Sequence, residues 1–369
     1  MSLVVVAPNA FRDGPDSRQA AAAMGEGVRS ARPAARVAAI PLADGGDGTL
    51  DVLADRLRAN VETVRVTGPA GSPTDARLAL TEDEAIIESA DAAGNRLLEP
   101  GQRDPFETST FGVGELIRHA LDRGLGRIVV AVGGTGTIDV GAGALQALGV
   151  RFRDDRGSNL APTPKGLAGV RSVDVGGLDA RLAHTELVVL ADVDSPLRDS
   201  PRLYGPQKGL DEERRPQLES TLESVAEIAQ RTFDPPYDLL RAPMLGAGGG
   251  LPAGLGGFLG ASVVGGADYV ARRAGLPEAL AGADALLTGE GRLDSTSFLG
   301  KAPGYAVAAA HSRGIRSCVF TGQVAAGADQ HLPATSDCVV LGTDPGRPPQ
   351  ETLDALREAA AGWTRTELG

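Results

Sequence analysis

The sequence is poor in aromatic residues, in lysine and in cysteine. Phe, Trp and Tyr together make up only 4% of the 369 residues, so the core has to be built mainly from aliphatic side chains. Lysine occurs three times, at Lys165, Lys208 and Lys301, beside 33 arginines. Each lysine is therefore a candidate for a task that the planar guanidinium group cannot perform. The two cysteines, Cys318 and Cys338, lie in apolar runs, which favours buried thiols over a disulfide or a metal pair.

No stretch of the sequence is apolar for long enough to cross a membrane, and none is strongly basic. The first apolar run, Leu3–Ala7, ends at Pro8, short of the core of a signal peptide and of the roughly 20 residues of a membrane span. The net charge of −12 lacks the electrostatic signature of nucleic-acid binding. We therefore expect a cytoplasmic protein that acts on small molecules, without nucleic-acid or membrane partners. Whether it forms a homo-oligomer is left open.

Short runs of Val, Ile and Leu alternate with Ala-rich stretches of helical period, which indicates a parallel sheet covered by helices. At roughly 150 residues per domain, 369 residues predict two domains. Strands are expected at Leu3–Ala7, Val37–Pro41, Ala85–Glu88, Ile128–Val132, Leu187–Ala191, Ala285–Thr288, Ser317–Thr321 and Val339–Leu341. Helices are expected at Ser17–Ser30, Thr49–Arg58, Gly112–Arg123, Ala142–Leu148, Asp211–Arg231, Gly300–Arg313 and Gln350–Thr364. Long loops are expected at Arg151–Gly177 and Asp234–Gly260, and an exposed acidic turn at Glu82–Glu84.

Acidic residues and glycines gather where four of the expected strands end. The turns read PLADGGDGT, GGTGTIDVGAG, ADVDS and GEGRLD, and their charged residues are Asp44, Asp47, Asp139, Asp192, Asp194, Glu290, Arg292 and Asp294. The carboxyl ends of the strands form the edge at which open α/β sheets bind ligands. The sequence therefore predicts a site at this edge.

The composition of these turns points to a phosphate-bearing ligand with a metal ion. Clustered carboxylates repel one another unless a hard cation such as Mg²⁺ binds, and glycine amides at the start of helices bind anions. A phosphate compound with Mg²⁺ meets both demands, which favours phosphoryl transfer over hydrolysis or redox chemistry. Lys208 in YGPQKG and Lys301 in LGKAP are the candidate cations.

Three other features leave alternatives open. GGTGTIDVG approaches the dinucleotide-binding fingerprint, but Asp139 stands at its last glycine position; Asp154 and Asp155 lie at about the distance expected of a ribose ligand. No Walker A motif is present, because Ala302 follows Gly300-Lys301. The glycine-rich segment Gly246–Ala261 fits a phosphate-binding loop and a close packing segment equally well.

The order and spacing of these motifs resemble the bacterial class I glycerate kinase family along nearly the whole chain. The shared segments are APNAF, PLADGGDGT, RDPFETSTFGVGELI, GAGALQALG, ADVDSPL, YGPQKG, GAGGG, TGEGRLD and GKAP. The resemblance implies phosphorylation of D-glycerate to a phosphoglycerate, dependent on ATP and Mg²⁺. It also implies a Rossmann-like parallel-sheet domain formed by both chain ends, residues 1–75 and 284–369. A second α/β domain, residues 76–283, would be inserted there, with the active site in the cleft between the two.

The resemblance places Asp192 at the family's proposed catalytic base, and the chemistry of the residues suggests the other roles. The predicted catalytic residues are Asp192, Lys208 and Arg292. The predicted nucleotide ligands are Gly45, Gly46, Gly133, Gly134, Thr135, Gly136 and Lys301. The predicted substrate ligands are Arg12, Ser89 and Asp139, and the predicted metal ligands are Asp44, Asp47, Glu290 and Asp294.

The chain departs from the family pattern at three segments. Pro8-Asn9-Ala10-Phe11-Arg12-Asp13 stands where the family has Pro-Asp-Ser-Phe-Lys-Gly, and Ile138-Asp139-Val140-Gly141 stands where it has Asn-Asp-Gly-Gly. Ser89 to Asn95 also differs from the family pattern Met-Ala-Xaa-Ala-Ser-Gly-Leu. These changes alter polar groups expected to meet the acid, so they leave the identity of the hydroxy acid open. Two further hypotheses remain: an NAD-dependent oxidoreductase, and a non-catalytic nucleotide- or metabolite-binding protein descended from a kinase.

Overall fold

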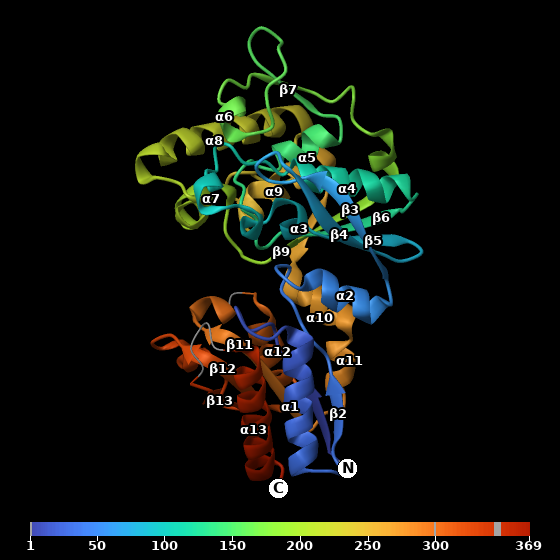
Figure 1. The fold of residues 1–369 in the computed structure, drawn as a ribbon, viewed down its shortest axis with the longest axis vertical. Helices are drawn as coiled ribbons and strands as arrows, with labels where there is room; N and C mark the ends of the chain where they lie inside the picture. Colours follow the sequence, from blue (N-terminus) through green and yellow to red (C-terminus); the bar gives the residue numbers. More distant parts are fainter. Residues whose placement is uncertain (1, 299, 343–347) are drawn as a thin grey trace. The chain divides into compact units, whose positions relative to one another are not determined.

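The computed structural model describes residues 2–298, 300–342 and 348–369 (Figure 1). The chain divides into two compact units. Unit 1 comprises Met1–Asp44, Asp51–Arg56 and Gly266–Gly369, and unit 2 comprises Gly45–Leu50 and Leu57–Gly265. Each unit has its own sheet and its own hydrophobic core. Within the described ranges, no helix has both the length and the apolar character needed to span a membrane.

Unit 1 is built on a five-stranded parallel sheet with the order β13-β12-β11-β1-β2. Its strands are β1 (Leu3–Val6), β2 (Arg36–Ala39), β11 (Ala285–Leu293), β12 (Arg316–Val324) and β13 (Ser336–Val340). Its helices are α1 (Ser17–Ala31), α10 (Gly266–Ala274), α11 (Leu276–Leu280), α12 (Ala302–His311) and α13 (Pro349–Glu367), and α2 (Thr49–Leu57) begins in unit 2 and enters unit 1 at Asp51.

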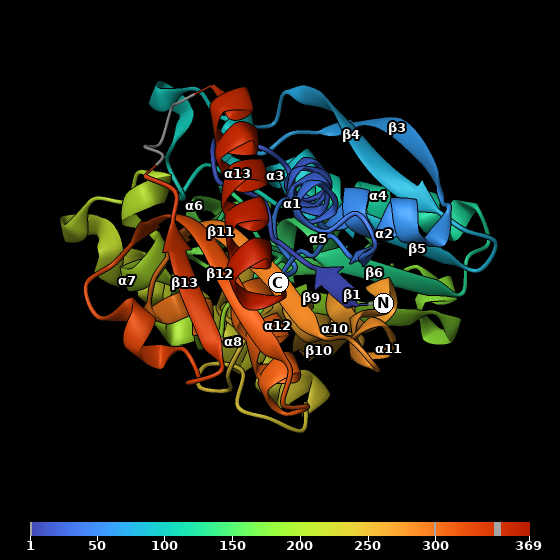
Figure 2. The same ribbon diagram turned by 90° about the horizontal axis from the view of Figure 1, so that it is seen from below.

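Helices cover both faces of this sheet. Val4 and Val6 of β1 belong to a core cluster with α1 and α13, whereas Val5 belongs to a second cluster with α10, α11 and α12. This alternation follows from the period of two of a β-strand. Helices α1 and α13 lie side by side (Figure 2) and approach closely, since a Cβ atom on Gly27 would lie 2.2 Å from the carbonyl oxygen of Arg357.

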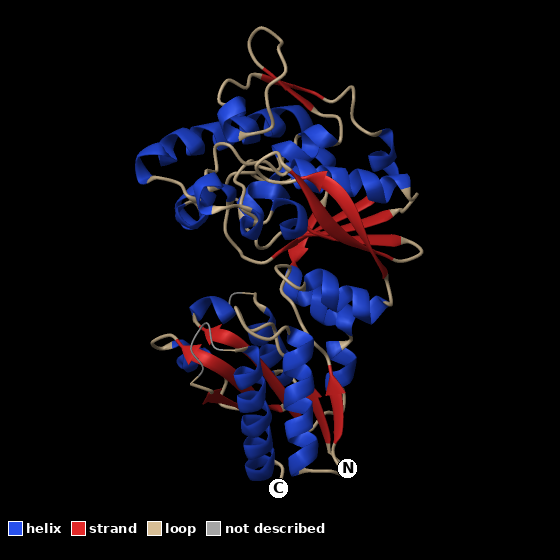
Figure 3. Cartoon of the chain, viewed as in Figure 1, coloured by secondary structure: helices blue, strands red, loops and turns tan. Residues whose placement is uncertain are grey.

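Unit 2 contains a six-stranded mixed sheet with the order β10-β9-β6-β5-β4-β3. Figure 3 draws the strands of the chain in red and its helices in blue. Its strands are β3 (Asn60–Thr67), β4 (Pro73–Leu80), β5 (Glu84–Glu88), β6 (Arg127–Ala131), β9 (Glu186–Ala191) and β10 (Ser262–Gly265), and a separate pair is formed by β7 (Arg151–Arg153) and β8 (Ser172–Asp174). Its helices are α3 (Ser89–Ala93), α4 (Phe111–Asp122), α5 (Ala142–Ala147), α6 (Pro164–Leu167), α7 (Ser200–Tyr204), α8 (Arg215–Phe233) and α9 (Leu251–Leu259). Strands β5, β6, β9 and β10 are parallel to one another. Strand β4 is antiparallel to both of its neighbours, β3 and β5.

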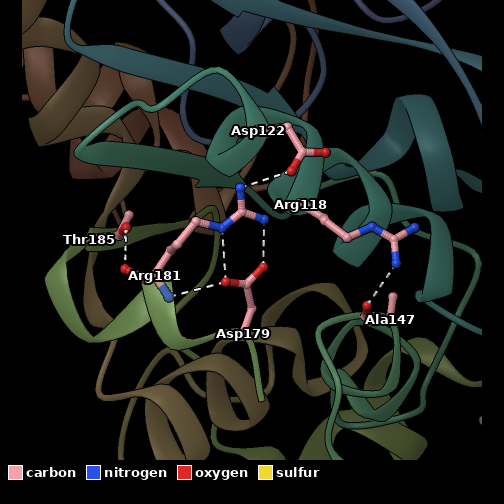
Figure 4. A network of polar contacts seen from close by, with 6 residues as sticks. All are labelled: Arg118, Asp122, Ala147, Asp179, Arg181 and Thr185. Atoms are coloured by element: carbon pink, nitrogen blue, oxygen red, sulfur yellow. Dashed lines mark hydrogen bonds and ion pairs between the residues drawn. The ribbon is translucent and has the colours of Figure 1, made fainter. Parts of the chain in front are cut away.

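Ion pairs at the surface connect the turn before β9 with the C-terminal end of α4 (Figure 4). The Arg181 guanidinium donates to Asp179 at 2.7 Å and to Asp122, the last residue of α4, at 2.8 Å. Arg118, one turn earlier in α4, donates to the carbonyl oxygen of Ala147 at 3.4 Å. Because these ion pairs lie at the solvated surface, their net contribution to stability is small.

The structure confirms the α/β fold class and each of the eight expected strands, with ends shifted by a few residues. Other expectations were wrong. The stretch Arg151–Gly177 contains β7, α6 and β8, and Asp234–Gly260 contains α9. Glu84 is not part of an exposed turn, because it begins β5 and is only 3% exposed.

The unit boundaries also differ from those expected from the sequence. Residues 57–75 belong to unit 2, because β3 and β4 pair with each other and β4 continues the sheet through β5. Residues 266–283 belong to unit 1, because α10 and α11 pack against its sheet and α12. The sequence did not reveal the β3–β4 hairpin.

Candidate functional site

In unit 1, acidic residues gather at the carboxyl ends of β1, β2 and β11. Asp44 follows β2, and its carboxylate accepts a hydrogen bond from the Asn9 side chain at 3.3 Å, just beyond β1. Glu290 lies within β11, and Asp294 follows that strand directly. The charges of Asp44, Asp294 and Lys301 all shift the pKa of Glu290. These four predicted site residues are therefore neighbours.

Glu290 is the most unusual of these groups. It is 7% exposed, and its Oε1 atom is buried without a hydrogen-bond partner. The pKa of Glu290 is raised to about 7, with burial as the largest cause. The Ser297 hydroxyl and Lys301 lower the pKa, and the negative charges of Asp44 and Asp294 raise it. A buried carboxylate with an unsatisfied oxygen attracts a cation, because an unpaired charge is costly to bury.

Asp294 and Lys301 complete the group in unit 1. Asp294 Oδ1 accepts hydrogen bonds from the amide and the hydroxyl of Thr296. Partial burial raises the pKa of Asp294, but these hydrogen bonds outweigh it, so the pKa is lowered. Lys301 occupies the N-cap position of α12. Arg292 and Arg12 are exposed, and the backbone of Arg12 lies beside Gly291, where an added Cβ atom would be 3.0 Å from the Arg12 amide nitrogen.

In unit 2, two glycine segments lie directly against each other. The amide of Gly133 donates to the carbonyl oxygen of Gly45 at 3.0 Å. A Cβ atom on Gly133 would lie 2.3 Å from the Cα atom of Gly46, and one on Gly134 would lie 2.6 Å from Oδ1 of Asp47. Only glycine allows this approach, which explains why both turns predicted to bind phosphates are rich in it.

Asp192 lies beside this pair of segments. It follows β9 directly, and its Oδ2 atom would be 2.9 Å from a Cβ atom on Gly133. The negative charge of Asp192 also acts on Lys208. The structure thus brings Asp192, Gly133, Gly134, Gly46 and Asp47 together within unit 2.

Lys208 is buried beneath the glycine loop that follows β6. It is 4% exposed, and its Nζ atom donates to the carbonyl oxygen of Thr137 at 2.9 Å and to Oγ1 of Thr135 at 3.2 Å. Burial lowers the pKa of Lys208 to about 8, and the charges of Asp192 and Asp139 oppose this shift. Lys208 therefore fixes the loop as well as placing a positive charge near Asp192.

Asp139 has a structural role. Its carboxylate accepts hydrogen bonds from the Thr110 amide and hydroxyl, both at 2.8 Å, and from the amides of Gly141 and Gly143, both at 3.1 Å. Burial raises the pKa of Asp139, and these hydrogen bonds lower it. Asp139 is 1% exposed and is held within the loop by these hydrogen bonds, and its contact with the substrate stays a prediction from the sequence.

The remaining predicted positions in unit 2 lie around the same loop. Ser89 begins α3, is fully buried, and its Oγ atom has no hydrogen-bond partner. Nearby, the amide of Asn95 donates to the Gly134 carbonyl oxygen at 3.0 Å, and the amide of Gly136 donates to the Ala93 carbonyl oxygen at 2.8 Å. Thr135 is 4% exposed and is held by Lys208.

The segment Gly246–Ala261 packs behind the loop. A Cβ atom on Gly248 would lie 2.5 Å from the Val132 carbonyl oxygen, and one on Gly249 would lie 1.9 Å from that of Thr137. The structure therefore favours the close-packing interpretation of this segment over a phosphate-binding loop. Asp154, the candidate ribose ligand, accepts the amides of Arg156 and Ser158 in an exposed turn, so its geometry is that of a turn residue.

Sequence reasoning missed one buried acidic residue, Glu88. It ends β5, is 3% exposed, and accepts the amides of Gly48 and Leu50 at Oε2, both at 3.1 Å. The pKa of Glu88 is raised to about 7, with burial as the largest cause; the charges of Asp91 and Asp47 also raise it, and the two amides lower it. The available signal was a glutamate at the end of an apolar strand, directly before Ser89.

The predicted site residues thus form two groups, one in each unit. Asp44, Glu290, Asp294 and Lys301 are neighbours in unit 1, and Asp47, Gly133, Gly134 and Asp192 are neighbours in unit 2. Among the residues that the structure describes, no three His, Cys, Asp or Glu side chains are arranged to hold a metal ion by themselves. Three kinds of group are thus available: glycine amides that can bind anions, the buried carboxylate of Glu290 that can bind a cation, and the carboxylate of Asp192 near the buried Lys208.

Known proteins resemble the chain over almost its entire length. A family model described as "Glycerate kinase family" matches residues 4–364. The chain is 34% identical to the glycerate kinase of Bacillus subtilis over 98% of this chain and 95% of the relative. It is 35% identical to the glycerate 2-kinase of Escherichia coli over 81% of this chain and 80% of the relative. The crystal structure of a proposed glycerate kinase 2 from Salmonella typhimurium LT2 superposes with a TM-score of 0.83 at 33% identity, covering 99% of this chain and 98% of that one.

Proposed function

Because the chain belongs to the glycerate kinase family, we propose that it transfers the γ-phosphoryl group of ATP to a hydroxyl group of D-glycerate or of a closely related short hydroxy acid. The hydroxyl oxygen attacks the γ-phosphorus atom, the bond from phosphorus to the bridging oxygen breaks, and ADP leaves. Such a reaction asks the protein mainly to position groups and to neutralise charge.

Asp192 is the proposed general base. Its position beside Gly133, close to the buried charge of Lys208, is the observation that carries this assignment. A base must lie within reach of the hydroxyl proton and must be ionised at the working pH. The positive charge of Lys208 favours the ionised form of Asp192. Asp192 then takes the proton that the hydroxyl group loses as the new phosphorus–oxygen bond forms.

The glycine amides are the proposed phosphate ligands. The amides of Gly133 and Gly136 already donate to the carbonyl oxygens of Gly45 and Ala93 and so hold the loop in place. The proposed phosphate contacts are therefore the backbone N–H groups of Gly134 and Thr135, together with those of Gly45 and Gly46 on the facing segment. Lys301, at the start of α12, adds a positive charge. Arg292, Arg12 and Ser89 remain the proposed contacts of the reacting groups and of the acid.

The carboxylates of unit 1 fit a magnesium ion that arrives with the nucleotide. Glu290 has a buried oxygen without a partner, and Asp44 and Asp294 lie near it. Asp47 stays a metal ligand predicted from the sequence. Mg²⁺ in such enzymes is usually held by one or two carboxylates together with phosphate oxygens and water. When bound, the ion would neutralise negative charge on the transferred phosphoryl group.

Product analysis tests the proposal directly. Purified protein with MgATP and D-glycerate should release ADP, which a coupled assay measures. The same assay is run with L-glycerate, tartronate and other short hydroxy acids in place of D-glycerate. Phosphorus NMR then identifies the phosphorylated hydroxyl group. Release of ADP no faster than without an acid, across the whole panel, would overturn the proposal.

Substitution of Asp192 tests the base assignment. Asp192→Asn should lower kcat by about a hundredfold or more, as expected for a lost general base, with little change in melting temperature. The matched comparison is Asp194→Asn, which removes an exposed carboxylate two residues away and should cost less than tenfold. Equal losses in the two variants would reject Asp192 as the base.

A further inference from the structure

Glu88 is a buried carboxylate beside the candidate site, and it has no place in the mechanism above. It belongs to β5, a strand of the unit 2 sheet, and it reaches the segment Gly45–Leu50 with a single oxygen. The two amides that donate to it flank Thr49, the first residue of α2. Glu88 thus caps the N-terminus of a helix that is about 40 residues away in the sequence.

The segment that Glu88 holds carries three of the predicted ligands, Gly45, Gly46 and Asp47. Its other contacts within unit 2 are made with the glycine loop after β6: the Gly133 amide donates to Gly45, and Gly134 faces the Asp47 carboxylate. The residues on either side of the segment, up to Asp44 and from Asp51, belong to unit 1. The two hydrogen bonds of Glu88 therefore attach this segment to β5 in the sheet of unit 2.

We propose that Glu88 is a positioning residue, which holds the Gly45–Gly48 turn against the Gly133–Gly136 loop so that the two sets of amides present one phosphate-binding surface. This proposal rests on the proposed kinase function. Glu88 itself touches neither the phosphates nor the acid. It acts through the backbone of Gly48 and Leu50, and a displacement of about 1 Å in groups that bind reactants can cost a hundredfold in rate.

Glu84 provides a matched comparison on the same strand. It is also 3% exposed, but it lies at the other end of β5, where it pairs with Arg127 at 3.4 Å. Substituting either glutamate removes a buried carboxylate from the same strand. Only substitution of Glu88 removes an acceptor from the turn.

The test compares Glu88→Ala, Glu88→Gln, Glu84→Ala and the unchanged protein, each as the full chain. Amide hydrogen exchange, followed by mass spectrometry on peptides that cover residues 45–50 and 133–136, reports the attachment of the turn without any need for activity. Steady-state kinetics with MgATP and the best hydroxy acid report its consequence. Thermal unfolding shows that each variant is folded at the assay temperature.

We expect Glu88→Ala to speed exchange in both peptides, to raise the KM for ATP and to lower kcat about tenfold to a hundredfold, with the KM for the acid unchanged within twofold. In Glu88→Gln the side-chain carbonyl oxygen can still accept hydrogen bonds from both amides, so each change should be smaller than in Glu88→Ala. Because this variant keeps a side chain of the same size, it should fold even if Glu88→Ala does not. Glu84→Ala should lower the melting temperature without changing either KM.

Unchanged exchange at residues 45–50 in Glu88→Ala, or equal kinetic losses in Glu84→Ala, would overturn the positioning role. Faster exchange in Glu88→Ala together with no phosphorylation of any acid by the unchanged protein would instead reject the proposed function. The attachment of the turn would then stand, and its role in a kinase reaction would fall with that function.

Discussion

Glu290 is a buried residue that lowers the stability of the folded protein when it is ionised, yet it suits a site that binds a cation. Its carboxyl group lies at the edge where β1, β2 and β11 end, one of its oxygens is unsatisfied, and two other carboxylates are close by. Within the described residues, the groups that lower the pKa of Glu290 and so favour its ionised form are the Ser297 hydroxyl and Lys301. Such a group is expected at a site that binds a cation, since active sites retain charges that folding alone disfavours.

The pKa of Glu290 yields a prediction on stability. Because its pKa is raised from 4.5 to about 7, the folded protein binds more protons than the unfolded chain between these values, and its stability falls as the pH rises through them. In metal-free protein, Glu290→Gln should therefore raise the free energy of unfolding at pH 8 by up to about 3 kcal/mol. At pH 5 the gain should be much smaller. Urea unfolding at the two pH values measures this, and equal gains at both would show that ionisation is not the cause.

At this scale, the sequence indicated which residues gather at the site better than it indicated their roles. Asp192, Lys208 and Glu290 could be singled out because they follow strands or occupy distinct motifs. Asp139 follows a strand in the same way, yet its carboxylate is saturated by Thr110, Gly141 and Gly143. Glu88 escaped notice because its partners are backbone amides from a distant segment, and such partners leave no trace in side-chain patterns.

Among the elements, the glycine-rich segment before and within α9 supports the loop after β6. Gly248, Gly249 and Gly250 have consecutive positive φ values of 53°, 71° and 89°, a path that other residues rarely follow. Their lack of side chains lets the segment contact the backbone at Val132, Thr137 and Val140. The shape of the loop proposed to bind phosphates thus depends on an element that is expected to touch no ligand.

Two glycines of this segment separate backbone strain from close packing. Gly249→Ala would place a Cβ atom 1.9 Å from the Thr137 carbonyl oxygen, whereas Gly260→Ala, at a similar φ of 68°, meets nothing within 4 Å. We expect Gly260→Ala to cost about 1–2 kcal/mol from backbone strain alone. Gly249→Ala should cost a further ~1–3 kcal/mol, because the loop must move. Urea unfolding followed by circular dichroism measures both, and equal losses would contradict the role of close packing.

The elements that the sequence revealed are those with strong, simple patterns. Buried parallel strands such as β6 and β9 are continuous apolar runs, and α1 and α13 have clear helical periods. Strands β3 and β4 were missed because β3 is largely exposed and carries charged residues between its apolar ones. Helix α9 was assigned to a loop because six glycines lie directly before or within it, and tertiary packing overrides their poor helix propensity.

At the scale of the molecule, the two units differ in how they depend on chain continuity. Both hydrophobic clusters of unit 2 are formed entirely by residues between Val64 and Val263. In unit 1, β1 lies between β2 and β11, so strands from both ends of the chain must meet to complete the sheet. The resemblance to a known family assigned both chain ends to one unit. The residues at which the chain passes between the units could not be predicted, because they depend on contacts between distant segments and not on local sequence patterns.

This difference predicts how fragments of the chain behave. A fragment of residues 57–265 retains both core clusters of unit 2 and should unfold cooperatively on heating, although it lacks the turn that Glu88 holds. Residues 266–369 alone leave β11 without β1 and α13 without α1, so the apolar surfaces of both are exposed, and this fragment should lack a cooperative transition. Adding residues 1–56 should restore one, because Val4 and Val6 then complete the core. Circular dichroism melts of the three samples test this, and cooperative unfolding of 266–369 by itself would show that β1 is dispensable for the sheet.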